Sequence, residues 1–336
     1  MKKSLITMAL MAACAVPAMA QSSVSIYGVV DAGLEHTNSA GVSNTSIVSG
    51  AQSGSRIGFK GVEDLGSGLS TKFVIEQGFN VDTGAEATAG VAFSRQAWLG
   101  LSSATMGEVR LGRQETPLYK TVVGIDPFGA GLAGNALGIL GAGTYTTRAN
   151  NAVTYVSPSM SGVTASAQYG FGEVANQSDA NEKLSANVAY VAGPLMVSGA
   201  YSTEKFNAVA QDDKKTDYIV GGTYDFQVVK AHVGFAESTL KNNLTANEIT
   251  ARNYLVGVSV PMGAHTVLAS LVQNESKGIA DTTTQQYALG YTYTMSKRTN
   301  VYASLSHVKN DSATGLASMA VGSGANKYNV GIRHKF

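Results

Sequence analysis

The last ten residues of the chain, 327–336, alternate between two kinds of side chain. One side of the segment is mostly apolar (Tyr328, Val330, Ile332, His334 and Phe336), and the other is polar or charged (Lys327, Asn329, Arg333 and Lys335). Successive side chains of a β-strand point to opposite faces, so this pattern predicts a strand with one apolar face. Lipid on the apolar face and water on the polar face would satisfy such a strand, an arrangement typical of a membrane β-barrel.

Segments with the same two-residue period recur from residue 24 onward, in pairs joined by short turns. An opening strand at 24–35, seven pairs and the closing strand at 327–336 amount to sixteen strands. The pairs are 56–60 with 70–79, 93–102 with 108–114, 151–156 with 163–171, 184–191 with 195–203, 217–224 with 227–238, 253–260 with 265–274, and 285–294 with 299–309. The pairs are connected by longer, polar loops, as at 36–54, 80–92 and 310–325. This organisation predicts an all-β fold, a 16-stranded antiparallel transmembrane β-barrel with a water-filled lumen.

A soluble β-sandwich or propeller is the main structural alternative, because its strands would alternate as well. Its apolar faces would meet in a shared core, whereas the mean hydropathy here is only +0.03 and 14% of residues are charged. Many tyrosines lie near predicted strand ends, as the aromatic girdles of a membrane barrel require. They are Tyr27, Tyr155, Tyr169, Tyr190, Tyr201, Tyr218, Tyr254, Tyr302 and Tyr328. The membrane barrel is therefore the favoured fold.

The N-terminus has the pattern of a cleaved export signal. Lys2 and Lys3 precede an apolar stretch at 5–16, and Ala18-Met19-Ala20 forms a small-x-small cleavage site. We expect a signal peptide over 1–20 and a transmembrane β-barrel over 21–336. A lipoprotein signal ending at Cys14 is the alternative, but Met11 suits its cleavage motif poorly.

The mature chain would have no cysteine and a nearly neutral charge. Cys14 is the single cysteine, so no disulfide would contribute to stability. Removal of Lys2 and Lys3 from the 24 basic residues leaves 22 against 23 acidic ones. A nucleic-acid partner normally requires a basic excess, and we expect none.

No motif indicates an enzyme, a cofactor or a metal. Residues 129–134, GAGLAG, match a dinucleotide fingerprint in letters, but Asp126-Pro127 precedes them instead of a strand. The five histidines lie at 36, 232, 265, 307 and 334, without metal-ligand spacing. An outer-membrane hydrolase would need a catalytic constellation on one strand face, and a structural or adhesive barrel would need a plugged lumen.

The connection at 115–149 is the longest in the chain and consists largely of glycine and small apolar residues. Long loops in compact proteins are usually functional or disordered. We expect this loop to fold inward onto the lumen wall, the alternative being an exposed, flexible loop.

Several short motifs resemble those of the trimeric general porins of β-proteobacteria. They are SVSIYGVVD at 23–31, SRIGFKGVEDLG at 55–66, FSRQAWLGL at 93–101, RLGRQ at 110–114, NAVTYVSP at 151–158 and the HKF end at 334–336. The resemblance covers the mature chain. It implies a homotrimer in outer-membrane lipid and lipopolysaccharide, passive diffusion of ions and small hydrophilic solutes, and a third loop folded into each pore. It also implies that Phe336 is read by the barrel-assembly machinery and that Arg56, Arg95 and Arg148 line the pore wall.

Periodicity bears on the facing of only two of these arginines. Arg56 alternates with Ile57, so a lumen position is natural. Arg95 shares parity with Leu99 and opposes Trp98, and a subunit interface would explain apolar residues on both faces of that strand. The facing of Arg148 cannot be read, because it precedes its strand.

The selectivity site is expected to be a basic side faced by a few carboxylates. We assign Arg56, Lys72, Arg95, Arg110 and Arg148 to the basic side, Asp126 to the loop opposite, and Asp31 and Glu76 to the wall nearby. Rings of charge set the ion preference of a pore, here a mild preference for anions. A channel specific for one class of anionic nutrient is the alternative function.

Overall fold

The computed structural model describes residues 22–140, 145–175, 180–206, 213–242, 247–278, 281–310 and 324–336. The expected signal peptide and Cys14 lie outside these residues. The strands are β1 (Ser23–Ser39), β2 (Val42–Ser49), β3 (Arg56–Gly66), β4 (Leu69–Gly78), β5 (Gln96–Ser103), β6 (Gly107–Glu115), β7 (Arg148–Val156), β8 (Val163–Gly170), β9 (Lys183–Ala192), β10 (Leu195–Phe206), β11 (Asp213–Asp225), β12 (Lys230–Asn242), β13 (Asn247–Met262), β14 (His265–Lys277), β15 (Thr282–Thr294), β16 (Thr299–Asn310) and β17 (Gly324–Lys335). Between β6 and β7 lie the helix α2 (Pro117–Ile125) and the 3₁₀ turn η1 (Ala136–Gly138).

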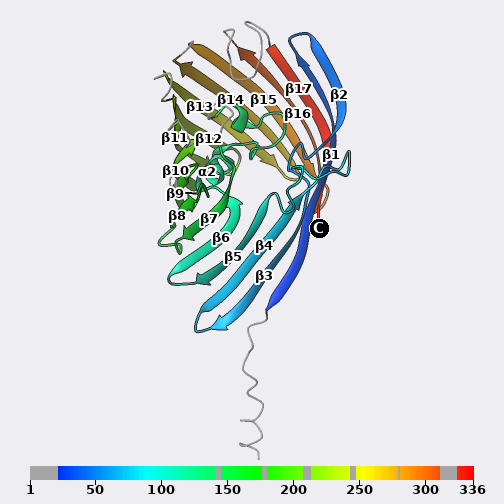
Figure 1. The fold of residues 1–336 in the computed structure, drawn as a ribbon. Helices are drawn as coiled ribbons and strands as arrows, with labels where there is room; N and C mark the ends of the chain where they lie inside the picture. The colour runs from blue at the N-terminus through cyan, green and yellow to red at the C-terminus, as the bar shows by residue number, and fades with distance from the viewer. Residues whose placement is uncertain are drawn as a thin grey trace, which may run out of the picture.

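All strands belong to one antiparallel sheet, which closes on itself where β1 pairs with β17. Figure 1 shows the tilted strands surrounding a central space, with α2 on the inner side. The last residue extends the closure, because Gly28 N donates to Phe336 O (3.0 Å) and Phe336 N to Gly28 O (3.1 Å). Closure leaves no edge of unpaired backbone groups, which a sheet in lipid requires.

Seventeen strand segments make sixteen positions around the barrel. Both β2 and β3 run antiparallel to β1 and pair with the edge of β1 opposite β17, β2 along Ala32–Ser39 and β3 along Ser23–Val29. Together they form one interrupted strand. Residues 50–55, between the two halves, are called the inner bend below. The predicted sixteen-stranded barrel is thereby confirmed.

The predicted long loop at 36–54 is wrong. The strands β1 and β2 continue to a tight turn at Ala40-Gly41, which has positive φ angles at both residues. This hairpin is held by pairs of polar side chains, such as His36 Nδ1 with Thr45 Oγ1 (2.7 Å). Because β2 is rich in serine, threonine and asparagine, hydrophobic alternation could not reveal it.

The two faces of the sheet differ as expected for a membrane barrel. Large apolar side chains such as Val256 (59% exposed) and Leu289 (47% exposed) project outward. Polar side chains such as Asn253, Asn274 and Thr284 are fully buried on the inner side. A soluble sandwich has the opposite arrangement, with apolar faces packed against each other. The outer surface therefore suits lipid as its solvent.

Two tyrosines expected in the aromatic girdles lie on the inner face instead. The Tyr27 hydroxyl donates to Glu76 Oε2 (2.9 Å), and the Tyr302 hydroxyl donates to Asp31 Oδ1 (2.6 Å). By contrast, Tyr218, Tyr254 and Tyr328 are exposed among apolar neighbours on the outer face. Tyrosine count alone could not separate these roles.

The connection between β6 and β7 packs on the inner face of the opposite wall. Thr116 caps α2 by accepting a hydrogen bond from Tyr119 N (3.2 Å), and Pro117 occupies the first turn. The buried side of α2 joins an apolar cluster with strands β11–β14 (Leu118, Val122, Ile125, Ile219, Ala236, Leu255 and Val272). None of the helices in the described ranges is long and apolar enough to cross a membrane.

Glycines in the wall allow this close packing. A Cβ at Gly221 would lie 2.8 Å from Ile125 Cδ1, and one at Gly290 would lie 2.7 Å from the Phe128 ring. Real Cβ atoms do not approach so closely, so larger residues at these positions would push the connection toward the lumen.

Candidate functional site

Three arginines from three different strand beginnings line one polar cavity of about 460 Å³. Arg56 is the first residue of β3, Arg148 the first of β7, and Arg95 lies immediately before β5. The cavity is bounded on its other side by α2 and the loop that follows it. The remaining lining residues are Gln52, Ser53, Gly54, Glu115, Tyr119, Lys120, Val123, Gly129 and Ala130.

Two carboxylates hold the three guanidinium groups in place. Glu76 Oε1 lies 2.7 Å from Arg95 Nε and 3.9 Å from Arg56 Nη1. Glu115 Oε1 lies 3.7 Å from Arg148 Nη2. Within the described lining and its ion pairs, the four cations Arg56, Arg95, Arg148 and Lys120 exceed these two carboxylates by two charges. The cavity is thus a region of positive potential.

The facing of Arg95 does not follow from its parity with Leu99, because Arg95 precedes β5, which begins at Gln96. Its side chain points to the inner face, where it meets Glu76. Trp98 also lies on the inner face, with the Arg110 guanidinium 4.5 Å from its ring centroid. The cation–π contact accounts for an aromatic residue on that face, so Trp98 gives no support to a subunit seam.

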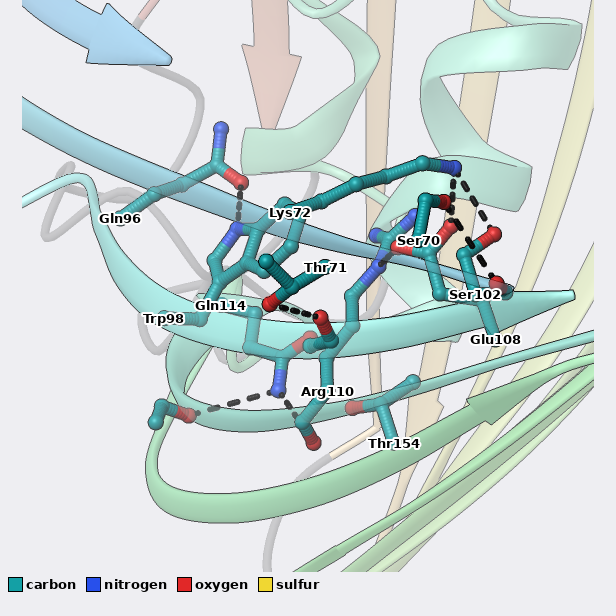
Figure 2. A network of polar contacts seen from close by, with 12 residues as sticks. Ser70, Thr71, Lys72, Gln96, Trp98, Ser102, Glu108, Arg110, Gln114 and Thr154 are labelled. Atoms are coloured by element: carbon teal, nitrogen blue, oxygen red, sulfur yellow. Dashed lines mark hydrogen bonds and ion pairs between the residues drawn. The ribbon is translucent and has the colours of Figure 1, made fainter. Parts of the chain in front are cut away.

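Lys72 and Arg110 form a second basic group on β4 and β6, which Figure 2 shows from close by. Both share Glu108: Lys72 Nζ lies 2.9 Å from Oε2 and Arg110 Nε lies 2.5 Å from Oε1. Lys72 Nζ also donates to Ser102 Oγ (2.9 Å). Two cations share one carboxylate, so this group has one unbalanced positive charge. Glu108 follows Gly107, the first residue of β6, so the group lies near the short turn between β5 and β6.

The prediction that Asp126 faces the basic side is wrong. Asp126 is 3% exposed and its carboxylate accepts three backbone hydrogen bonds, from Phe128 N (3.0 Å), Ala130 N (2.9 Å) and Ala136 N (3.1 Å). Burial outweighs these donors and raises the pKa of the Asp126 carboxyl to about 6. Asp126 organises the loop after α2, and Glu115 is the carboxylate that opposes the arginines.

Asp31 is fully buried and, like Asp126, accepts hydrogen bonds from backbone N–H groups. Its Oδ2 accepts from Gln52 N (3.0 Å) and Ser53 N (2.7 Å), and its Oδ1 from the Tyr302 hydroxyl (2.6 Å). The carboxylate therefore binds the inner bend to the seam of the barrel. Nothing in the linear sequence joins residues 31, 52 and 302.

Phe336 closes the barrel on the apolar face. Its ring covers Gly28, where a Cβ would lie 2.3 Å from Phe336 Cζ. The side chain remains 44% exposed among outward-facing residues of β17. The terminal aromatic is thus accessible from the lipid side.

Nine of the twelve lining residues were not predicted as site residues, among them Gln52, Glu115, Tyr119 and Lys120. The residues Glu115, Tyr119 and Lys120 belong to the expected loop, whose composition indicates no facing. Across the described ranges, no group of three histidine, cysteine, aspartate or glutamate side chains is placed to hold a metal ion.

Comparison with known proteins agrees with this architecture. A family model for the Gram-negative porin matches residues 7–313. An outer-membrane porin protein of Bordetella pertussis is 34% identical over the whole of both chains. An anion-selective porin from Comamonas acidovorans superposes with a TM-score of 0.85 at 29% identity, over 94% of this chain and all of that one.

A more distant structure shows the fold alone. An outer-membrane protein of Vibrio cholerae, in its trimer form, superposes with a TM-score of 0.73 at 18% identity, covering 94% of this chain and 99% of that one. Because the family model spans most of the sequence and the Bordetella relative matches along its full length, the chain belongs to the Gram-negative porin family and is a porin of the outer membrane.

Proposed function

We propose that the barrel is a general diffusion channel with a mild preference for anions, and that this preference is set where α2 and the residues directly after it lie beside Arg56, Arg95 and Arg148. The observation that carries the proposal is the single polar cavity these arginines share, in which cations outnumber carboxylates. The Comamonas porin, described as anion-selective, supports the sign of the preference. The relatives are porins, and the residues of the arginine cavity can be explained by ion passage without a chemical reaction.

The expected preference is small, because water fills the lumen. A charge about 7 Å from a passing ion in water contributes about 0.6 kcal/mol. Several such charges favour the passage of chloride over potassium but are too weak to bind either ion tightly. A channel specific for an anionic nutrient would instead need a desolvated binding site.

Conductance separates the two functions. In planar bilayers, the conductance of one insertion should rise in proportion to KCl, and adding a small dicarboxylate or phosphate should not saturate it. If the protein is a homotrimer, as the resemblance to trimeric porins suggests, each insertion should comprise three equal levels. Saturation at millimolar solute would favour the nutrient-specific channel, and single levels would contradict the trimer.

Export and assembly account for the two ends of the chain. We propose that residues 1–20 are removed on export, which the intact mass of protein recovered from outer membranes would test. We further propose that the barrel-assembly machinery reads the exposed Phe336 and that the apolar outer face contacts lipid and lipopolysaccharide.

Deletion of Phe336 should therefore reduce the amount of inserted protein and leave the conductance of inserted channels unchanged. The residue lies on the outer face and does not line the arginine cavity. Quantification of outer-membrane fractions, with Phe226→Ala at an exposed turn as control, measures the first effect. Wild-type amounts of the deletion variant would contradict the assembly role.

A further inference from the structure

The inner bend, residues 50–55, leaves the sheet between β2 and β3 and enters the lumen. Gln52, Ser53 and Gly54 line the arginine cavity. The bend also meets the loop after α2: Leu132 N donates to Ala51 O (2.5 Å). Two backbone elements, the loop after α2 and the inner bend, therefore border the arginine cavity.

The two elements are in close contact. A Cβ on Gly131 would lie 2.1 Å from Gln52 O, so no side chain fits between them. Gly138, in the same loop, has no atom within 4 Å of the corresponding position. The loop and the inner bend are thus packed together at Gly131 and free of such contact at Gly138.

Asp31 determines where the inner bend lies. Its carboxylate accepts from the backbone N–H groups at the middle of the bend, Gln52 and Ser53. Its backbone oxygen accepts from Gly50 N (2.8 Å) and from Ser55 Oγ (3.1 Å), at the two ends of the bend. One residue of β1 thereby fixes the whole bend, and the Tyr302 hydroxyl orients the carboxylate.

The inner bend in turn positions Arg56. Arg56 Nε donates to Gly54 O (2.9 Å) and Nη2 to Ser53 Oγ (2.7 Å). The nearest carboxylate, Glu76, is 3.9 Å from Nη1 and constrains the guanidinium less. Displacement of the bend would release Arg56 to approach Glu76.

We propose that Asp31 is a positioning residue for ion selectivity: by holding the inner bend, it keeps the Arg56 guanidinium directed into the constriction. This inference rests on the proposed anion preference. The expected change in anion preference on loss of Asp31 has the opposite sign from a simple charge effect, because Asp31 is itself negative. Loss of its charge alone would strengthen a preference for anions, whereas loss of its hydrogen bonds weakens that preference.

Two substitutions remove the same charge and differ in the hydrogen bonds they keep. In Asp31→Asn, the amide oxygen can still accept from Gln52 N and Ser53 N while the amide donates to Tyr302. In Asp31→Ala, every acceptor of the side chain is lost. Asp31→Ala should lower the anion-to-cation permeability ratio by about twofold, close to the effect of Arg56→Gln, whereas Asp31→Asn should keep or raise the ratio.

Zero-current potentials of channels inserted in a KCl gradient provide the measurement, so only folded protein is counted. Glu35→Ala is the matched control, because Glu35 is on the same face of β1 and pairs with Lys327 (3.6 Å), away from the bend. The Asp31→Ala effect should also disappear when Arg56 is already glutamine. Equal ratios for Asp31→Ala and Asp31→Asn would overturn the inference.

Gly131→Ala decides the matter if Asp31→Ala yields no channels. It displaces Gln52 from the loop side and should lower the ratio, whereas Gly138→Ala should not change it. An unchanged ratio in Gly131→Ala would then overturn the inference. A wild-type channel without anion preference, or an Arg56→Gln variant that matches wild type, would instead contradict the proposed function.

Discussion

Replacement of Asp126 by alanine is expected to raise the conductance of each pore and to make the current noisier. The Asp126 carboxylate accepts from the backbone N–H groups of Phe128, Ala130 and Ala136, and the hydrogen bonds from Phe128 and Ala136 are buried. An unsatisfied buried donor costs about 1–3 kcal/mol, so loss of all three should release the loop that follows α2. The barrel itself would persist, because its strand pairing does not involve Asp126.

Single-channel recording of Asp126→Ala measures this effect directly. Asp82→Ala, at an exposed position of another loop, removes the same charge and should conduct like wild type. If Asp126→Ala conducted like Asp82→Ala, the packing of the loop after α2 would not depend on the carboxylate. The loop would then be held by its apolar contacts, those of Phe128 and Leu132 with the wall.

Simultaneous replacement of Arg56, Arg95 and Arg148 by glutamine should have the larger effect on selectivity. Three charges near the ion path, each contributing about 0.6 kcal/mol in water, together contribute about 1.8 kcal/mol, so their removal should change the anion-to-cation permeability ratio by about twentyfold. The ratio should move toward cations, since Glu76 and Glu115 remain. The pore should stay open, because glutamine is no longer than arginine.

The matched control removes three cations from the outer face. Lys214, Lys241 and Arg252 are exposed and point to the same face as the outward-facing apolar residues of β11, β12 and β13. Their replacement by glutamine changes the net charge equally but leaves the lumen intact. A control that shifted the zero-current potential as far as the lumen variant would show that total charge, and not the arginine cavity, sets the preference.

The barrel could be predicted because lipid on one face and water on the other require apolar and polar residues to alternate along each membrane strand. Each strand faces lipid on one side and water on the other, so β13 to β17 alternate clearly between residues such as Val256 and Asn253. The exception is β2, where serine and threonine occupy both faces. Polar side-chain pairs above the apolar part of the wall stabilise that hairpin, and no hydrophobic period marks it.

The constriction could be predicted only in part, since its geometry depends on contacts distant in sequence. Arg56 and Arg95, which belong to recognisable motifs, line one cavity with Arg148, and the role of these arginines in ion selectivity stays a prediction. Asp126 was misplaced because a lone carboxylate in an apolar loop can face water or cap backbone groups, and only the folded loop decides. The position of the inner bend depends on Asp31 and Tyr302, which are separated by 271 positions in the sequence. The position of α2 depends on wall glycines such as Gly221, where the absence of a side chain leaves room for Ile125.

The central claim is that the arginine cavity acts on ions through water, and the zero-current potential of the wild-type channel at two salt levels tests it most directly. The screening length is about 10 Å near 0.1 M salt and about 3 Å at 1 M. In a KCl gradient centred near 0.1 M, the potential should show a clear preference for anions, and the preference should largely disappear near 1 M. A preference for cations at low salt, or an anion preference that is unchanged at 1 M, would contradict the account.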